Sequence, residues 1–125
     1  MQSKVTTRTQ AAAWNQFAKP VIVSLIALTA LSARQSTETF TGVITDSECA
    51  TGDHSRMRMG SNDAECARAC VSAHGASFVL YTGKEVYALS DQQTPDQFAG
   101  QKVRVTGTLD AKTKTIQVKT IMAAQ

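Results

Sequence analysis

The residues that can do chemistry gather in one stretch of the chain, from Cys49 to Gly75. This stretch contains all three cysteines, both histidines and two of the four methionines. Its spacing is Cys49-x4-His54-x2-Met57-x-Met59-x6-Cys66-x3-Cys70-x3-His74. Thiols, imidazoles and thioethers bind soft and borderline metal ions, and thiols also form disulfides. The stretch therefore predicts either a metal site or a cysteine cross-link.

A metal site follows from the spacing of two cysteines. Cys66 and Cys70 lie four residues apart in a predicted helix over residues 63–74, so they share one face of that helix. This spacing directs two ligands to one point, as the paired histidines of zinc proteases do. We expect Cys49 and His54 to complete the site from the preceding loop. Three cysteines and one histidine are a ligand set typical of zinc.

Three other side chains in the stretch are secondary candidates. Met57 and Met59 would add thioether ligands and shift the preference toward Cu(I). His74 is a weaker candidate, because it lies two helical turns from Cys66. Each of these side chains also has an ordinary structural interpretation: methionine as adaptable packing and histidine as a solvated surface group.

A disulfide is the alternative use of the cysteines. Residues four apart on a helix have Cβ atoms roughly 6 Å apart, against about 3.8 Å in a disulfide, so Cys66 and Cys70 cannot bridge each other. Cys49 would pair with one of them and leave one thiol free. Such a bond would staple the loop to a small exported interaction domain without a metal. The odd number of cysteines leaves both uses open.

Catalysis has less support in the sequence. Cys-x3-Cys differs from the Cys-x2-Cys of thioredoxin-like enzymes, and no β-α-β pattern accompanies it. A thiol-redox role therefore ranks third. The sequence does not settle whether the protein is an enzyme, and it favours a binding module.

Residues 1–33 have the three-part pattern of a secretory signal peptide. A basic polar region is followed by an apolar run from Pro20 to Ala33 that ends in small residues. This run of about 14 residues is shorter than the roughly 18 to 20 that cross a bilayer. We predict cleavage near Ala33 and export to the periplasm or the cell exterior. An uncleaved segment that tethers the protein to the membrane is the alternative.

Charge argues against one class of partner. From Arg34 onward, ten Lys and Arg residues face ten Asp and Glu residues, so the net charge of +3 comes from the first residues of the chain. A nearly neutral domain is a poor binder of nucleic acid. The expected partner is a protein or a small ligand, and membrane contact is expected only through an uncleaved signal.

The rest of the chain predicts a small β-rich domain. Residues 34–38 read as a flexible leader, and period-2 alternation predicts strands near 39–45, 103–109 and 116–119. Two further strands, near 76–81 and 85–89, are predicted as a hairpin around the turn Thr82-Gly83-Lys84. Gly42 marks a bend in the first strand. A short helical turn starts at Thr94-Pro95. Five strands with a helical element before the fourth predict a Greek-key barrel like the oligonucleotide/oligosaccharide-binding (OB) fold over residues 39–125. The segment 46–75, with its cysteine-bearing helix, is inserted between strands one and two.

Three segments also resemble a known group of proteins. They are Thr41-Gly-Val-Ile-Thr-Asp-Ser-Glu-Cys49, Cys66-Ala-Arg-Ala-Cys70-Val and Phe98-Ala-Gly-Gln-Lys-Val-Arg-Val-Thr-Gly-Thr-Leu109. Together they are similar to small exported bacterial domains of unassigned function. The typical pattern of that group is Gly-x-[Ile/Val]-x-Asp-Ser-x-Cys, Cys-x3-Cys and Val-x-Val-x-Gly. The resemblance covers most of residues 39–121. It implies a signal-bearing β-rich domain in which the three cysteines act as a unit, and it implies no activity.

Overall fold

The computed structural model describes residues 35–125, and the predicted signal peptide lies outside this part of the chain. One α-helix, α1 (Asp63–His74), connects the first two strands, and a 3-10 helix, η1 (Thr94–Phe98), precedes the fourth. The strands are β1 (Thr37–Asp46), β2 (Phe78–Tyr81), β3 (Val86–Leu89), β4 (Lys102–Asp110) and β5 (Thr115–Ala123). β1 therefore begins at Thr37, inside the stretch predicted as a leader.

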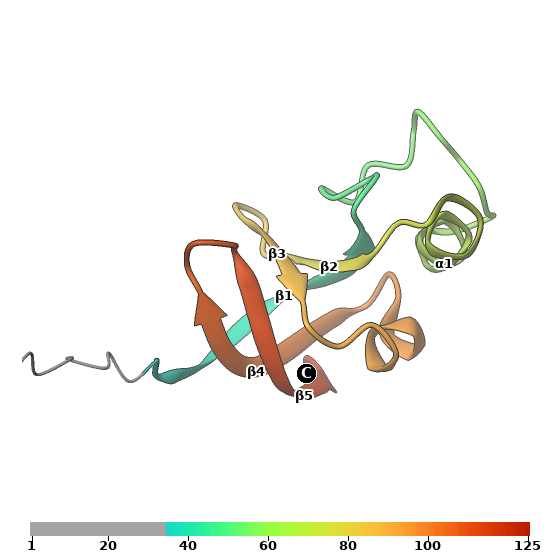
Figure 1. The fold of residues 1–125 in the computed structure, drawn as a ribbon. Helices are drawn as coiled ribbons and strands as arrows, with labels where there is room; N and C mark the ends of the chain where they lie inside the picture. Colours follow the sequence, from blue (N-terminus) through green and yellow to red (C-terminus); the bar gives the residue numbers. More distant parts are fainter. Residues whose placement is uncertain (1–34) are drawn as a thin grey trace, which may run out of the picture. The chain divides into compact units, whose positions relative to one another are not determined.

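The five strands form one mixed sheet that closes on itself (Figure 1). Their order is β1-β2-β3-β5-β4, and β4 pairs back with β1. All neighbours are antiparallel except β3 and β5, which run parallel over a short contact at Leu89 and Ile116. The prediction of a mainly β domain with a helix inserted between its first two strands is confirmed.

β1 has two partners along its length. From Thr37 to Val43 it pairs with β4, and from Val43 to Asp46 it pairs with β2. Gly42 lies at this change of partner, where a Cβ atom would stand 2.4 Å from the carbonyl oxygen of Tyr81. A residue with a side chain cannot replace it without moving the backbone of β2, so the close approach of the two strands requires glycine here.

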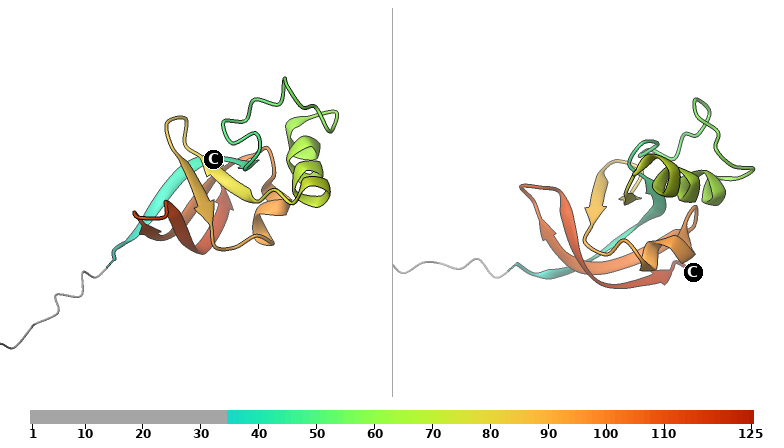
Figure 2. Two further views of the ribbon diagram at one scale, coloured as in Figure 1. Left: turned by 45° about the horizontal axis from the view of Figure 1, so that its top comes forward. Right: turned by 45° about the vertical axis from the view of Figure 1, so that its right-hand side comes forward.

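The core fills the inside of the closed sheet, and α1 covers one end of it (Figure 2). Alternate strand residues point inward. Ala67 of α1 is fully buried in the same cluster, so the helix packs on the core by a small side chain. The guanidinium of Arg68 donates to the carbonyl of Asp96 at 2.8 Å, which fixes α1 to η1. The buried apolar residues of this cluster are Ile44, Ala67, Phe78, Leu80, Leu89, Ala99, Val103, Val105, Ile116 and Ile121.

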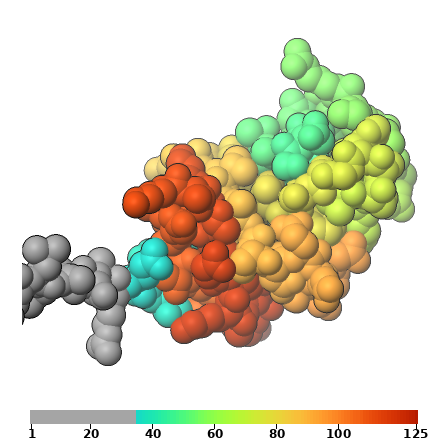
Figure 3. All heavy atoms as spheres, viewed as in Figure 1, coloured from blue at the N-terminus to red at the C-terminus, as the bar shows by residue number. Residues whose placement is uncertain are grey.

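The ends of α1 follow the predicted signals. The side chain of Asn62 accepts a hydrogen bond from the backbone N–H of Glu65, and Gly75 ends the helix in the left-handed conformation with φ 70°. The loop before α1 projects from the surface of the domain beside the helix (green in Figure 3). No helix within residues 35–125 has the length and apolarity needed to cross a membrane.

Candidate metal centre

Asp46 is the polar centre of the region where β1 meets the inserted segment. It ends β1 and is fully buried. Its Oδ1 accepts hydrogen bonds from the backbone N–H groups of Glu48 and Cys49, both at 3.0 Å. These bonds form a tight turn that brings Cys49 back over the end of the strand. A carboxylate without solvent requires such partners, and Oδ2 points away from the turn toward His54.

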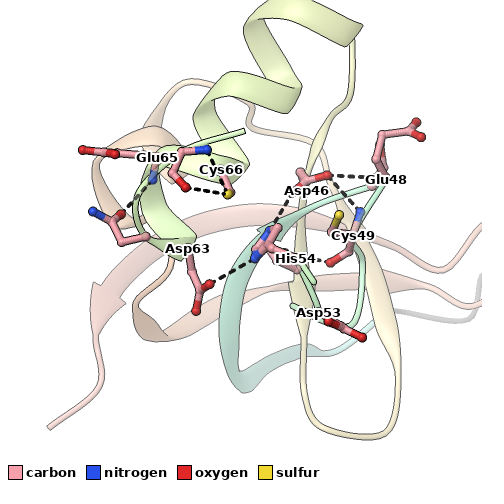
Figure 4. A network of polar contacts seen from close by, with 12 residues as sticks. Asp46, Glu48, Cys49, Asp53, His54, Asp63, Glu65 and Cys66 are labelled. Atoms are coloured by element: carbon pink, nitrogen blue, oxygen red, sulfur yellow. Dashed lines mark hydrogen bonds and ion pairs between the residues drawn. The ribbon is translucent and has the colours of Figure 1, made fainter. Parts of the chain in front are cut away.

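His54 lies between two carboxylates (Figure 4). Its Nε2 is 3.3 Å from Oδ2 of Asp46, and its Nδ1 is 3.1 Å from Oδ1 of Asp63, at the first residue of α1. The imidazole is 4% exposed, so solvent does not compete for either nitrogen. A carboxylate on one ring nitrogen fixes the orientation of the ring and directs the other nitrogen into the cluster.

Cys49 completes a compact group of three donors. One ligand atom each of Asp46, Cys49 and His54 lies within 4.8 Å of the other two, and all three residues are buried. The carbonyl of Cys49 also accepts a hydrogen bond from the hydroxyl of Thr45 at 3.0 Å, which holds the turn in place. Burial, followed by the negative charge of Asp46, raises the pKa of the Cys49 thiol.

Cys70 comes from α1. It is fully buried, and burial together with the charge of Asp46 raises the pKa of its thiol to about 11. Its sulfur is not one of the three donor atoms that lie within 4.8 Å of one another. Cys70 is therefore a buried thiol outside the three-donor group.

Cys66 is bound to the loop instead. Its sulfur accepts a hydrogen bond from the backbone N–H of Gly60 at 3.2 Å and donates to the carbonyl of the same residue at 3.6 Å. Gly60 packs tightly there, because a Cβ atom would stand 2.4 Å from the Cβ of Glu65. Both hydrogen-bonding capacities of the Cys66 thiol are used in holding the loop to α1.

The structure thus brings together some of the predicted site residues and separates others. Cys49 and His54 are in the three-donor cluster, whereas Cys66 and Cys70 are not. All three cysteines are free thiols, so the alternative disulfide of Cys49 with either helix cysteine is not formed. Outside the cluster, Met57 and Met59 are 37% and 40% exposed on the loop, and His74 is exposed at the end of α1.

Two acidic residues of the site were missed by the reasoning from sequence. Asp46 reads as an ordinary solvated loop residue beside Cys49, and Asp63 reads as a favourable charge in the first turn of a helix. One sequence signal could have identified Asp46: it follows a predicted strand and lies three residues before a cysteine. An Asp in this position can accept hydrogen bonds from the N–H groups of the next residues and so become buried. No local signal marks Asp63 as a partner of His54.

The cluster offers an oxygen, a sulfur and a nitrogen donor in a closed setting. This combination suits a borderline divalent ion, since carboxylate, thiolate and imidazole all bind zinc. It suits nucleophilic thiol chemistry poorly. Reactive cysteines have a lowered pKa and solvent access, whereas Cys49 has a raised pKa and is buried.

Comparison with known proteins adds one family match. The model of a family described as a protein of unknown function (DUF5818) matches residues 70–124, which run from Cys70 through β5. The matched residues leave out β1 and the loop that contribute Asp46, Cys49 and His54. Neither the search of curated proteins nor the search of solved structures found a match. The sheet from β2 onward is thus similar to a small domain family without an assigned function.

Proposed function

We propose that this protein is an exported metal-binding module, with a zinc ion held by Asp46, Cys49 and His54. The observation that carries the proposal is the convergence of three buried donors of different chemistry within 4.8 Å. Most buried polar groups are satisfied by a hydrogen bond to one partner. Here a carboxylate, a thiol and an imidazole meet at one point, which is the arrangement that a metal ion requires.

The position of His54 supports the presence of a cation. A neutral imidazole has one N–H group, but both ring nitrogens of His54 face carboxylate oxygens that can only accept. Both contacts are favourable if the ring is an imidazolium, or if Nδ1–H donates to Asp63 while Nε2 binds a metal ion. The second state is the carboxylate–histidine–metal arrangement found in many zinc sites.

Cys70 is the best fourth ligand, and it changes the predicted ligand set. It is fully buried on α1, and the charge of Asp46 helps to raise the pKa of its thiol, whereas the sulfur of Cys66 bonds to Gly60. A set of two thiolates, one imidazole and one carboxylate is four-coordinate and favours zinc over Cu(I), which prefers sulfur. The exposure of Met57 and Met59 removes the argument for a copper site that uses thioethers.

A closed site of this kind holds a protein together and does not activate water. All four proposed ligands are buried, so no coordination position faces solvent. The metal would fasten the loop and α1 to the end of β1, and would leave the sheet free to bind a partner. The strand order supports an OB-like fold, in which the connection between the first two strands borders the usual binding face. Export and removal of residues 1–33 remain part of the proposal.

The test is a metal count on the full-length chain, expressed in a bacterial host that can export it and purified without chelator. Elemental analysis should find one zinc per chain, with three free thiols after denaturation. Cys49→Ser and His54→Gln should each lose the metal. His74→Gln is the matched control for the second variant, since His74 is exposed and lies outside the three-donor group, and it should keep one zinc.

Two outcomes would contradict the proposal. If the protein remains metal-free after incubation with zinc, cobalt and Cu(I), the cluster is a hydrogen-bonded network only. If one free thiol is counted under denaturing conditions, the other two cysteines form a disulfide and the site has lost its sulfur ligands.

A further inference from the structure

The first half of β1 has one edge that no strand of residues 35–125 covers. Backbone polar groups alternate along a strand, and those of Ile44 point to the β4 side, where its N–H bonds to Gln101. The backbone polar groups of the odd-numbered residues point to the β2 side, as the bond from Ser47 N–H to the carbonyl of Ser77 shows. β2 ends opposite Val43, so the backbone groups of the preceding odd-numbered residues, Thr37, Thr39 and Thr41, face no partner strand.

A cleft opens at the end of this free edge. It has a volume of about 490 Å³, within the range of small-ligand sites. It lies where the turn after β2 departs from β1, and the exposed Gly83, which has no side chain, leaves backbone accessible there. The residues that line it are Thr41, Gly42, Val43, Tyr81, Thr82, Gly83 and Lys102. Lys102 is on β4 and borders the cleft from the opposite side of β1.

The sheet face beside the cleft is cationic. Lys102 is paired with Val43, and Arg104 is paired with Thr41 on one side and Met122 on the other. Directly paired residues have side chains on the same face of a sheet, so both cations project from the face that Thr41 and Val43 share, one strand away from the free edge. These cross-strand rows contain no acidic residue. Within residues 35–125, neither Lys102 nor Arg104 has an ion-pair partner.

We propose that the free edge of β1 and the adjoining cleft bind an extended acidic peptide by strand addition. The backbone of the peptide would pair with Thr39 and Thr41, and its alternate acidic side chains would contact Lys102 and Arg104. Main-chain bonds would provide the affinity, and the two cations would select acidic side chains. This binding surface goes beyond the proposed metal-binding function, because it uses none of the cluster residues.

The experiment uses a fluorescent octapeptide of alternating Glu and Thr, with an alternating Lys-Thr octapeptide as the comparison. Anisotropy with the full-length chain should show saturable binding of the acidic peptide only, and this binding should weaken as salt screens the charges. The double variant Lys102→Glu/Arg104→Glu should abolish it. Lys112→Glu is the matched control, because Lys112 is exposed in the β4–β5 turn, and it should leave binding unchanged.

The contribution of the edge is tested separately from that of the charges. Thr41→Pro removes an N–H that takes no part in the ladder with β4, so the sheet should remain intact while binding falls roughly tenfold or more. An acidic peptide with N-methyl groups on alternate residues tests the same pairing without altering the protein. Its binding should fall as well.

Each of four results would overturn the proposal. They are no binding of the acidic peptide, equal binding of the lysine peptide, unchanged binding of the N-methylated peptide, and a wild-type dimer that Thr41→Pro converts to a monomer. The last result would assign the edge to a second copy of this chain. Because all measurements can be repeated on the Cys49→Ser variant, failure of peptide binding is distinguishable from failure of metal binding.

Discussion

Replacing Asp46 by Asn separates the two roles of its side chain. The turn needs an acceptor for the N–H groups of Glu48 and Cys49, and the amide oxygen of Asn can accept both bonds. The other carboxylate oxygen, which faces His54, becomes an NH₂ group. This group can donate to a neutral imidazole but cannot bind a cation. Asp46→Asn should therefore keep the fold and lose the metal.

The two effects have different magnitudes. In Asp46→Asn the turn keeps an acceptor without its charge, so the unfolding free energy of the protein should fall by only about 1 kcal/mol. Asp46→Ala instead leaves two buried N–H groups unpaired, at about 1–3 kcal/mol each, so it should cost about 2–6 kcal/mol. Loss of an outer partner of a metal ligand weakens binding by about ten- to a hundredfold, so loss of a ligand should weaken zinc binding by more than about a hundredfold.

Urea unfolding in the presence of chelator measures the first effect, and zinc competition with a chromogenic chelator measures the second. Asp46→Ala serves as the control for structural damage. The reasoning is refuted if Asp46→Asn binds zinc as tightly as the wild type. It is also refuted if the metal-free Asp46→Asn protein is as unstable as Asp46→Ala, because Asp46 would then act only in the turn.

Three other predictions concern separate parts of the domain. Asp63→Asn retains an acceptor for the imidazole but removes its charge, so zinc affinity should fall about ten- to a hundredfold in the same competition assay. Gly42→Ala places a methyl group against the Tyr81 carbonyl, and urea unfolding should show a loss of about 1–3 kcal/mol that zinc does not restore. Hydrogen bonds from the Thr94 side chain and nearby backbone lower the pKa of Asp91. The ionised carboxylate therefore stabilises the folded protein above the unfolded pKa of about 3.9, and this stabilisation disappears as the pH falls through the folded pKa. The unfolding free energy of Asp91→Asn should therefore fall less between pH 5 and pH 2 than that of the wild type; an equal fall would contradict this assignment.

Most of the fold could be predicted from the sequence because its signals are local. Alternation of apolar and polar residues locates β1, β4 and β5, the turn around Gly83 locates the β2–β3 hairpin, and Asn62 and Gly75 mark the ends of α1. The predicted first and last residues of the strands were less accurate. β5 continues to Ala123 although the apolar alternation fades after Val118, because pairing with β4 maintains it. Tertiary pairing determines strand length where the local pattern is weak.

The site was predicted less completely, because burial is a property of the whole fold. Cys66 and Cys70 are equivalent in spacing and face, yet the sulfur of Cys66 bonds to Gly60, whereas the pKa of the Cys70 thiol is raised by burial and by the charge of Asp46. That difference depends on how the loop folds over the first turn of α1, and the four-residue spacing of the cysteines carries no information about the loop. The same holds for Asp63, whose side chain is largely exposed but whose Oδ1 reaches the buried imidazole.

The inserted segment begins and ends at neighbouring points of the sheet. Asp46 is paired with Phe78, and Ser47 bonds to Ser77, so the chain leaves and re-enters the sheet at adjacent positions. The loop before α1 could therefore vary in length without changing the pairing of β1 with β2. The helix could not be removed in the same way, because Ala67 is fully buried in the core cluster and α1 covers one end of the core. Asp46 is the one proposed ligand that belongs to the sheet. A bound metal would therefore cross-link a connection of variable length to a strand whose position the sheet fixes.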